Sequence, residues 1–414
     1  MRRALIIGGS LGGLLAANLL RLAGWEVTVF ERNPDDLTGR GAGLSTHPQL
    51  LDVLQRIGIE FGEGMGVKLD TLVCLDRNGR AFASCRNQRL MTSWGRLYRS
   101  LREPLPAESY RLGKSFARLE QDANGVTAIF DDGSSAAGDL LVAADGVRST
   151  VREQLSPEAQ PFYAGYVAWR AMLEERKVPT GIRTEIFGRY TFCLPEGELC
   201  LAYPVPGRNN ETQVGRRAYN IVWYRPTDIK ALTDLCTDAN GRYHGMAIPP
   251  PLVRPEVIAD IKATAQALVA PQIADVFTRA QPFFQPIFDL ESSRTVFGSV
   301  VLIGDAAFVA RPHVGAGVTK AALDATRLAE AASTEHLPLS LAQFEREQIL
   351  FGRGLIGLGR EEGAYYSAQL KPPEERTPAE LTRTADDVLR AHTTRTEQLA
   401  SVLAAARAGA ATSS

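Results

Sequence analysis

The feature that most constrains the fold lies in the first 31 residues: strand, glycine-rich turn, helix, strand and acid. An apolar strand over 4–7 runs into the turn Gly8–Gly13, and a second apolar strand over 27–30 ends at Glu31. Glycines let the turn approach a pyrophosphate, and the N-terminus of the following helix offers free N–H groups to it. Glu31 follows Gly13 by 18 residues, the spacing of an acid that binds ribose hydroxyls. The segment therefore predicts a dinucleotide site.

The turn and the acid supply the expected nucleotide contacts: Gly8, Ser10, Leu11, Gly13, Glu31 and Arg32. Ser10 stands where the usual fingerprint has its middle glycine. An acid at this position favours a free 2′-hydroxyl, so FAD or NAD fits better than NADP. The alternative is a tight turn that binds no ligand.

Composition narrows the class of protein further. The 414 residues are 45% hydrophobic, enough for two or three domain-sized units. Lys and Arg (46) nearly balance Asp and Glu (47) with no extended basic run, which argues against a nucleic-acid partner. No stretch approaches the ~18 apolar residues of a membrane span. Five scattered cysteines form no CxxC pair, so we expect no metal site, no disulfide framework and a cytoplasmic location.

Hydrophobic periodicity predicts the main elements. Helices are expected over 48–57, 94–105, 255–268, 319–332 and 341–358, the last with Ser340 as its N-cap. We expect a hairpin over 67–83 and another that joins 125–130 to 140–143. Aromatic, alternating strands over 166–170, 190–192, 199–203 and 219–224 predict an antiparallel sheet. The small-residue segment 404–414 is expected to fray.

Three motifs together resemble one enzyme family. They are the turn Gly8–Gly13 with Glu31, the segment 139–149 with Asp145, and the segment 304–317 with Asp305. In this order they resemble the FAD-dependent aromatic hydroxylases, the single-component flavoprotein monooxygenases of the p-hydroxybenzoate hydroxylase fold. The resemblance extends to about residue 335. Segments 163–170, 203–208 and 302–313 are most similar to the 2,6-dihydroxypyridine 3-hydroxylase-like branch, and 163–169 also resembles FAD-dependent urate hydroxylases.

The resemblance implies an α/β fold: a Rossmann-like FAD-binding domain with an inserted antiparallel-sheet substrate domain and C-terminal helices. It assigns 1–70, 98–165 and 285–370 to the FAD-binding domain and 71–97 and 166–284 to the substrate-binding domain. Residues 371–414 are expected to form a C-terminal helix and a flexible tail.

The resemblance also implies further FAD contacts: Gly43, Asp145, Asp305, Pro312, Gly315, Ala316 and Gly317. The Asp305 carboxylate can accept hydrogen bonds from ribityl hydroxyls, or it can simply cap a helix. A helix that opens at Gly317 can stabilise the flavin edge that becomes anionic on reduction. Family members carry Ser-Arg where this chain has Ser93-Trp94, and Arg96 or Arg99 is the candidate replacement.

The expected reaction is hydroxylation of a small electron-rich aromatic, a hydroxypyridine first, with NADH or NADPH and O₂. In this family the reaction proceeds through a flavin C4a-hydroperoxide. The resemblance also leads us to expect a homodimer. The alternatives are a urate- or salicylate-type flavin hydroxylase, a flavin-binding protein without turnover, and an NAD-dependent dehydrogenase.

A base that deprotonates a ring hydroxyl makes the ring more reactive, and histidine has a suitable pKa. His47 follows the Gly41–Leu44 loop, where related hydroxynicotinate hydroxylases carry a histidine, and His313 lies in the loop after Pro312. Either is a candidate base or a structural residue, and we expect His244, His336 and His392 at the surface. The residues expected to contact substrate are His47, Tyr203, Trp169, Tyr224 and Pro312, although strand aromatics are more often core.

Overall fold

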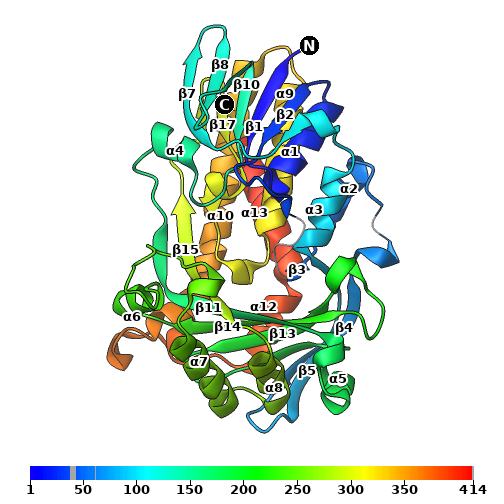
Figure 1. Cartoon of the computed structure of the whole chain (residues 1–414), viewed down its shortest axis with the longest axis vertical. Helices are drawn as coiled ribbons and strands as arrows, with labels where there is room; N and C mark the ends of the chain where they lie inside the picture. Colours follow the sequence, from blue (N-terminus) through cyan, green and yellow to red (C-terminus); the bar gives the residue numbers. More distant parts are fainter. Residues whose placement is uncertain (38–42, 61, 413–414) are drawn as a thin grey trace.

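The computed structural model describes residues 1–37, 43–60 and 62–412 and contains two large sheets (Figure 1). The first has six strands in the order β16-β17-β10-β1-β2-β6. Their bounds are β1 Arg3–Ile7, β2 Glu26–Phe30, β6 Tyr110–Arg111, β10 Leu140–Ala143, β16 Val296–Phe297 and β17 Val300–Leu302. All neighbours are parallel except β16 and β17. This is the Rossmann-like sheet that the sequence predicts.

Helices α1 (Leu11–Leu22), α3 (Trp94–Arg102) and α9 (Gly317–Ala332) pack together beside this sheet. Strands β7 (Phe116–Asp122), β8 (Gly125–Phe130) and β9 (Ser135–Gly138) form a separate antiparallel sheet, and the short α4 (Thr150–Leu155) contacts β7. The predicted pairing of 125–130 with 140–143 is therefore wrong. The β10 residues are apolar and fully buried, as suits a central parallel strand, and they pair with β1 and β17.

The second sheet has nine strands in the order β18-β15-β11-β14-β13-β12-β4-β5-β3. Their bounds are β3 Gly43–Ser45, β4 Val67–Leu75, β5 Ala81–Ser93, β11 Phe162–Glu174, β12 Tyr190–Cys193, β13 Leu199–Val205, β14 Ala218–Pro226, β15 Phe283–Glu291 and β18 Phe308–Val309. Its pairs are antiparallel except β12 beside β4, so the predicted hairpin over 67–83 and the aromatic sheet are confirmed. The sequence placed the boundary between the FAD-binding and substrate-binding domains at residue 70. In the structure β3 and the start of β4, which precede that residue, already pair within the nine-stranded sheet.

Helices cover both faces of the nine-stranded sheet. Helices α7 (Pro255–Leu268) and α8 (Pro271–Arg279) pack on one face, near the short helices α5 (Thr180–Ile186) and α6 (Ile229–Leu235) (Figure 1). The opposite face packs against α10 (Leu337–Ala368) and α12 (Ala385–Thr393). Helix α2 (Pro48–Arg56) packs on α9. The first turn of α7 carries a proline, which suits a helix start and matches its predicted bounds.

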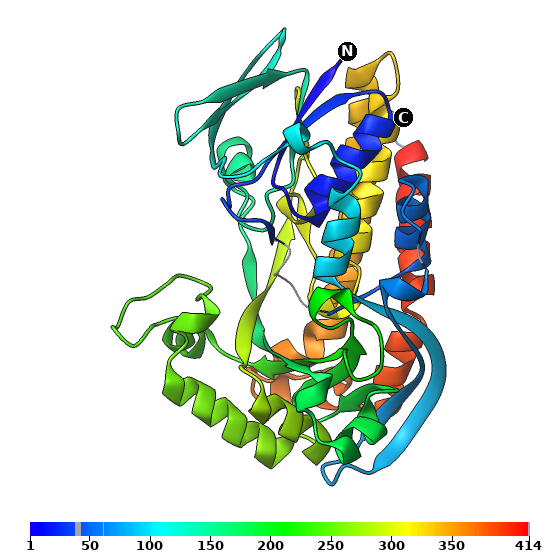
Figure 2. The same cartoon turned by 45° about the vertical axis from the view of Figure 1, so that its right-hand side comes forward.

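The C-terminal region differs from the prediction. Helix α10 begins at Leu337 with a proline in its first turn, so Ser340 lies inside the helix and does not cap it. After the single turn α11 (Pro378–Leu381) and α12, helix α13 (Arg395–Thr412) packs along α10, and Figure 2 shows it running along the molecule's long axis. Ala406 and Ala410 are buried, so the described part of segment 404–414 is not frayed. Nowhere in the described ranges does a helix combine the length and apolarity needed to cross a bilayer.

Candidate active site

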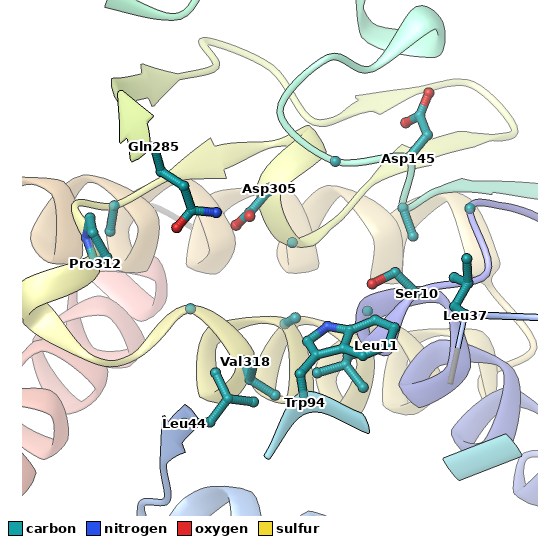
Figure 3. Close-up of a pocket in the computed structure, with 18 of the residues that line it drawn as sticks. Ser10, Leu11, Leu37, Leu44, Trp94, Asp145, Gln285, Asp305, Pro312 and Val318 are labelled. Carbon is teal, nitrogen blue, oxygen red and sulfur yellow. The ribbon is translucent and has the colours of Figure 1, made fainter. Parts of the chain in front are cut away.

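A cavity of about 570 Å³ opens between the two sheets (Figure 3). One side is formed by residues that lie one to three positions after the ends of four parallel strands: Gly8 after β1, Glu31 after β2, Asp145 after β10 and Asp305 after β17. Ligands of open parallel sheets bind in this crevice beyond the carboxyl ends of the strands. The topology therefore brings together three acids that lie far apart in the sequence.

The glycine turn is shaped by close backbone approach. Gly8 has φ of +106°, and a Cβ there would lie 2.4 Å from the carbonyl oxygen of Ala144. A Cβ at Gly13 would lie 1.9 Å from the Gly8 carbonyl oxygen, so α1 packs onto the turn only if this residue is glycine. Ser10 is the N-cap of α1, and its side chain makes no capping hydrogen bond. The first N–H groups of α1 are thus available to a phosphate.

The three acids are all among the residues that line this end of the cavity. Glu31 accepts hydrogen bonds from the N–H groups of Gly9 (2.8 Å) and Asn33 (3.0 Å), which fixes its carboxylate beside the turn. Asp145 has one buried carboxylate oxygen without a partner among the described residues, and burial raises its pKa. Figure 3 shows the Asp305 carboxylate directed into the cavity, and desolvation by the surrounding walls raises its pKa. Such acceptors suit a ligand rich in hydroxyl groups.

The loop after Asp305 completes the nucleotide end. Pro312 starts a short 3-10 turn, η8 (Pro312–Val314), and Gly315 follows in a left-handed conformation with φ of +69°. Gly315 and Gly317 line the cavity, so the N-terminus of α9 faces it. The predicted contacts Gly13 and Ala316 are not among the lining residues. Both belong to the backbone that shapes the turn and the start of α9.

Trp94 is part of the cavity wall, at the position where family members carry the arginine for which Arg96 or Arg99 was the candidate replacement. It stacks on Tyr98 with ring centroids 5.0 Å apart, and Figure 3 shows its indole beside Leu11. Neither Arg96 nor Arg99 lines the cavity, and the Arg96 Nε contacts the sulfur of Met65. At this point the wall therefore has an aromatic surface in place of the family's arginine.

The other end of the cavity is lined by the nine-stranded sheet. Tyr190 and Tyr203 stack with centroids 4.7 Å apart, and Tyr224 contacts the ring of His313 edge-on at 5.6 Å. The Tyr203 hydroxyl donates to the carbonyl of Gly43 at 3.2 Å. These rings form a flat, apolar wall suited to an aromatic ligand.

Trp169 does not belong to this wall. Side chains alternate along β11, so Ala168 and Arg170 line the cavity while Trp169 points to the other face. There it packs on Phe284 at 5.2 Å, in the core beneath α7 and α8. Its predicted role in substrate binding conflicts with this placement.

His47 is buried but is not among the cavity-lining residues. It occupies the N-cap position of α2, and its Nδ1 lies 3.0 Å from the hydroxyl of Thr319 on α9. Burial, and then the charges of Arg395 and Arg89, lower its pKa to about 4. The contact joins α2 to α9, so His47 is placed to position α9. Gly41 and Ala42, which precede it in the predicted loop, lie outside the described residues.

His313 does line the cavity. Its Nε2 lies 2.6 Å from the hydroxyl of Tyr166, and its Nδ1 lies 3.6 Å from a Glu362 carboxylate oxygen without a hydrogen bond. Burial lowers the pKa of His313, against the opposing effect of Glu362, so the ring is neutral near pH 7.

His392 and Arg395 are site residues that the sequence analysis missed. His392, expected at the surface, is buried and lines the cavity, as does Arg395 of α13. The Arg395 guanidinium lies 3.2 Å from His392 Nδ1 and donates to Glu362 at 3.2 Å. Of the other two histidines, His336 is exposed and His244 is bonded to Asp238 at 2.7 Å. The sequence does contain a sign that Arg395 is buried. Arg395 has helical spacing with Leu399, Ala406 and Ala410, so it lies on the buried face of the same helix.

Sequence comparisons agree with this geometry. The profile of the FAD binding domain family matches residues 2–180, and that of an FAD binding domain-like family matches 163–289. The 2,6-dihydroxypyridine 3-monooxygenase of Paenarthrobacter nicotinovorans is 32% identical over 357 residues, which are 86% of this chain and 89% of that protein. This chain belongs to the FAD-dependent aromatic hydroxylases.

A solved structure and a second type of enzyme also resemble this hydroxylase along most of its length. The structure of 2,6-dihydroxypyridine-3-hydroxylase from Arthrobacter nicotinovorans has a TM-score of 0.82 at 30% identity, covering 93% of this chain and 98% of that one. The FAD-dependent urate hydroxylase of Klebsiella pneumoniae is 28% identical over 369 residues, 86% of this chain and 88% of that protein.

The cavity of this hydroxylase fits FAD, its cofactor. The close-packed turn at Gly8 and the free N-terminus of α1 suit the pyrophosphate, Glu31 suits the adenosine ribose, and Asp305 suits the ribityl chain. The N-terminus of α9 then faces the flavin end. When bound, FAD supplies the redox chemistry and the activation of O₂.

Proposed function

We propose that this hydroxylase inserts one oxygen atom of O₂ into a hydroxypyridine, with NADH or NADPH as the reductant. The observation that carries the proposal is the wall of Tyr190, Tyr203 and Tyr224 at the end of the cavity that continues from the FAD cradle. A flat ring laid against these side chains is held in place and shielded from water. The similarity to 2,6-dihydroxypyridine 3-monooxygenase supports a nitrogen heterocycle as substrate.

We assign the chain's own groups as follows. Tyr203, Tyr224 and Pro312 orient the substrate ring, because all three line the cavity. His313 is the candidate for moving the substrate proton, because it is neutral, lines the cavity and is backed by Glu362. His47 acts through α9 and not on the substrate. The homodimer and the cytoplasmic location expected from the sequence remain predictions.

A urate-type hydroxylase is the second candidate, supported by the similarity to the Klebsiella enzyme. A panel of 2,6-dihydroxypyridine, urate and salicylate separates the candidates. We expect 2,6-dihydroxypyridine to stimulate oxidation of NADH or NADPH by the FAD-loaded protein, with a product heavier by one oxygen atom. If urate or salicylate alone is hydroxylated, the hydroxypyridine assignment fails. NADH oxidation that no ring compound stimulates would favour a flavoprotein without hydroxylase turnover.

A further inference from the structure

Charge is divided unevenly between the two ends of the cavity. The carboxylates that line it, Glu31, Asp145 and Asp305, all follow strands of the six-stranded sheet at the nucleotide end. The wall built by the nine-stranded sheet and the C-terminal helices contributes two arginines, Arg170 and Arg395, and no carboxylate from the described residues. The nucleotide end also carries Arg32, Lys114 and Arg148, which offset its three carboxylates, so a charge of one sign without a lining counter-charge is found only at the substrate end among the described residues.

A carboxylate behind the positive wall is Glu362 on α10. It accepts from Arg395 and lies near His313. Burial raises its pKa, but Arg395, His313 and Arg383 together outweigh that effect and lower it. Two other arginines remain unbalanced. Arg170 donates to the neutral Gln285 at 3.1 Å, Arg89 lies over the Tyr190 ring at 5.3 Å, and neither forms an ion pair within the described ranges. Arg395 therefore shares Glu362 with His313 and Arg383, while Arg170 and Arg89 have no carboxylate partner among the described residues.

Arg395 itself has unused hydrogen-bonding capacity. Its side chain is 8% exposed, and its Nε has no hydrogen-bond partner among the described residues. A Cβ added at Gly315 would lie 3.3 Å from the Nη1 of Arg395. The guanidinium therefore lies against the loop that carries Pro312 and His313. A buried guanidinium with a free donor is costly unless an acceptor binds it. Arg395 lines the cavity, so an acceptor bound there can approach its guanidinium.

We propose that Arg395 binds an anionic oxygen of the aromatic substrate and thereby selects rings that carry a negative charge. This inference rests on the proposed function and adds a specificity residue to it. A guanidinium in a water-poor site forms charge-assisted hydrogen bonds to such an oxygen. The oxygen belongs either to an ionised ring hydroxyl or to a carboxylate on the ring. Helices α12 and α13 thus complete the substrate site, since they supply His392 and Arg395.

The test is isothermal calorimetry on the FAD-loaded protein without NADH or NADPH, under anaerobic conditions. The ligands are 2,6-dihydroxypyridine at a pH where its ring hydroxyl is ionised, nicotinate as a carboxylate without a hydroxyl, and uncharged 2,6-dimethoxypyridine. The variants are Arg395→Met, Arg395→Lys and, as a matched control on α12, the exposed Arg390→Met. The double variant Arg395→Met/Glu362→Gln removes both charges if the single variant fails to fold.

We expect Arg395→Met, or the double variant, to weaken binding of one anionic ligand about 10- to 100-fold. Binding of 2,6-dimethoxypyridine should stay within about twofold, Arg395→Lys should lose less affinity, and Arg390→Met should match wild type. Selective loss for 2,6-dihydroxypyridine identifies the ring oxyanion as the group bound, and selective loss for nicotinate identifies the carboxylate.

Two outcomes overturn the inference. In the first, the Arg395 variants bind both anions as tightly as wild type does. In the second, all three ligands lose affinity equally, which assigns Arg395 a purely structural role. Either result leaves the proposed function standing if the wild-type protein hydroxylates a hydroxypyridine. Absence of wild-type turnover on every ring compound instead ends the proposed function, whatever the calorimetry shows.

Discussion

His47 should make the protein sensitive to acid. Burial lowers its pKa from 6.5 to about 4, so between these values the unfolded chain binds a proton that the folded chain rejects. Stability supplied by the neutral ring is therefore complete above about pH 6.5 and is lost as the pH falls toward 4. Between pH 8 and pH 5 the loss is about 2 kcal/mol of unfolding free energy.

The His47→Gln variant tests this value. The amide can still bond to Thr319 but does not titrate, so we expect the variant to lose about 2 kcal/mol less than wild type between pH 8 and pH 5. Equilibrium urea unfolding at both pH values measures the difference, and the exposed His336→Gln serves as the control. Because His47 is not in the cavity wall, turnover at pH 8 should fall by less than about tenfold, below general-base magnitudes. Equal acid losses in wild type and His47→Gln would refute the reasoning.

Three other predictions concern the cavity. Asp305→Ala should weaken FAD binding by about 1.5–3 kcal/mol, because ribityl hydroxyls lose a charged acceptor. Flavin absorbance after gel filtration measures the FAD retained, and an undiminished FAD content would contradict the assignment. Gly8→Ala should abolish FAD retention in a folded protein, because its Cβ would lie 2.4 Å from the Ala144 carbonyl oxygen. Circular dichroism checks that the variant folds, and a normal FAD content would contradict the assignment of this turn to FAD binding. His313→Gln should lower hydroxylation about 10²- to 10⁴-fold and remove an ionisation from the pH–rate profile, and an unchanged profile would exclude it as the proton carrier.

The nucleotide end of the site was predictable because its signals are local. A glycine turn between strand and helix, or an acid at the end of a buried strand, performs its role within a few residues of sequence. Glu31, Asp145 and Asp305 accordingly line the cavity as expected. The same holds for helix α7, whose periodicity and initial proline fix its bounds.

The substrate end was harder to predict, because it depends on which face of a sheet a residue occupies. Alternation along β11 places Ala168 and Trp169 on opposite faces, and only the packing of α7 and α8 decides which face is covered. The tyrosines Tyr203 and Tyr224 face the cavity for the same non-local reason.

The C-terminal helices show a second limit. A segment rich in alanine and glycine resembles a frayed tail, yet such small residues let α13 pack closely along α10. His392 and Arg395 look like surface residues from their polar neighbours, and they are buried because this packing turns them toward the cavity. The contact that gives them their role lies between segments distant in sequence.

The most direct test of the central claim is oxygen labelling. The FAD-loaded protein, 2,6-dihydroxypyridine and NADH or NADPH are incubated under ¹⁸O₂ in unlabelled water, and the product is analysed by mass spectrometry. A monooxygenase places one ¹⁸O atom in the ring product and reduces the other to water. We predict a product that carries a single ¹⁸O atom. A product whose new oxygen comes from water, or oxidation of the reductant with no hydroxylated product from any ring compound tested, would contradict the account.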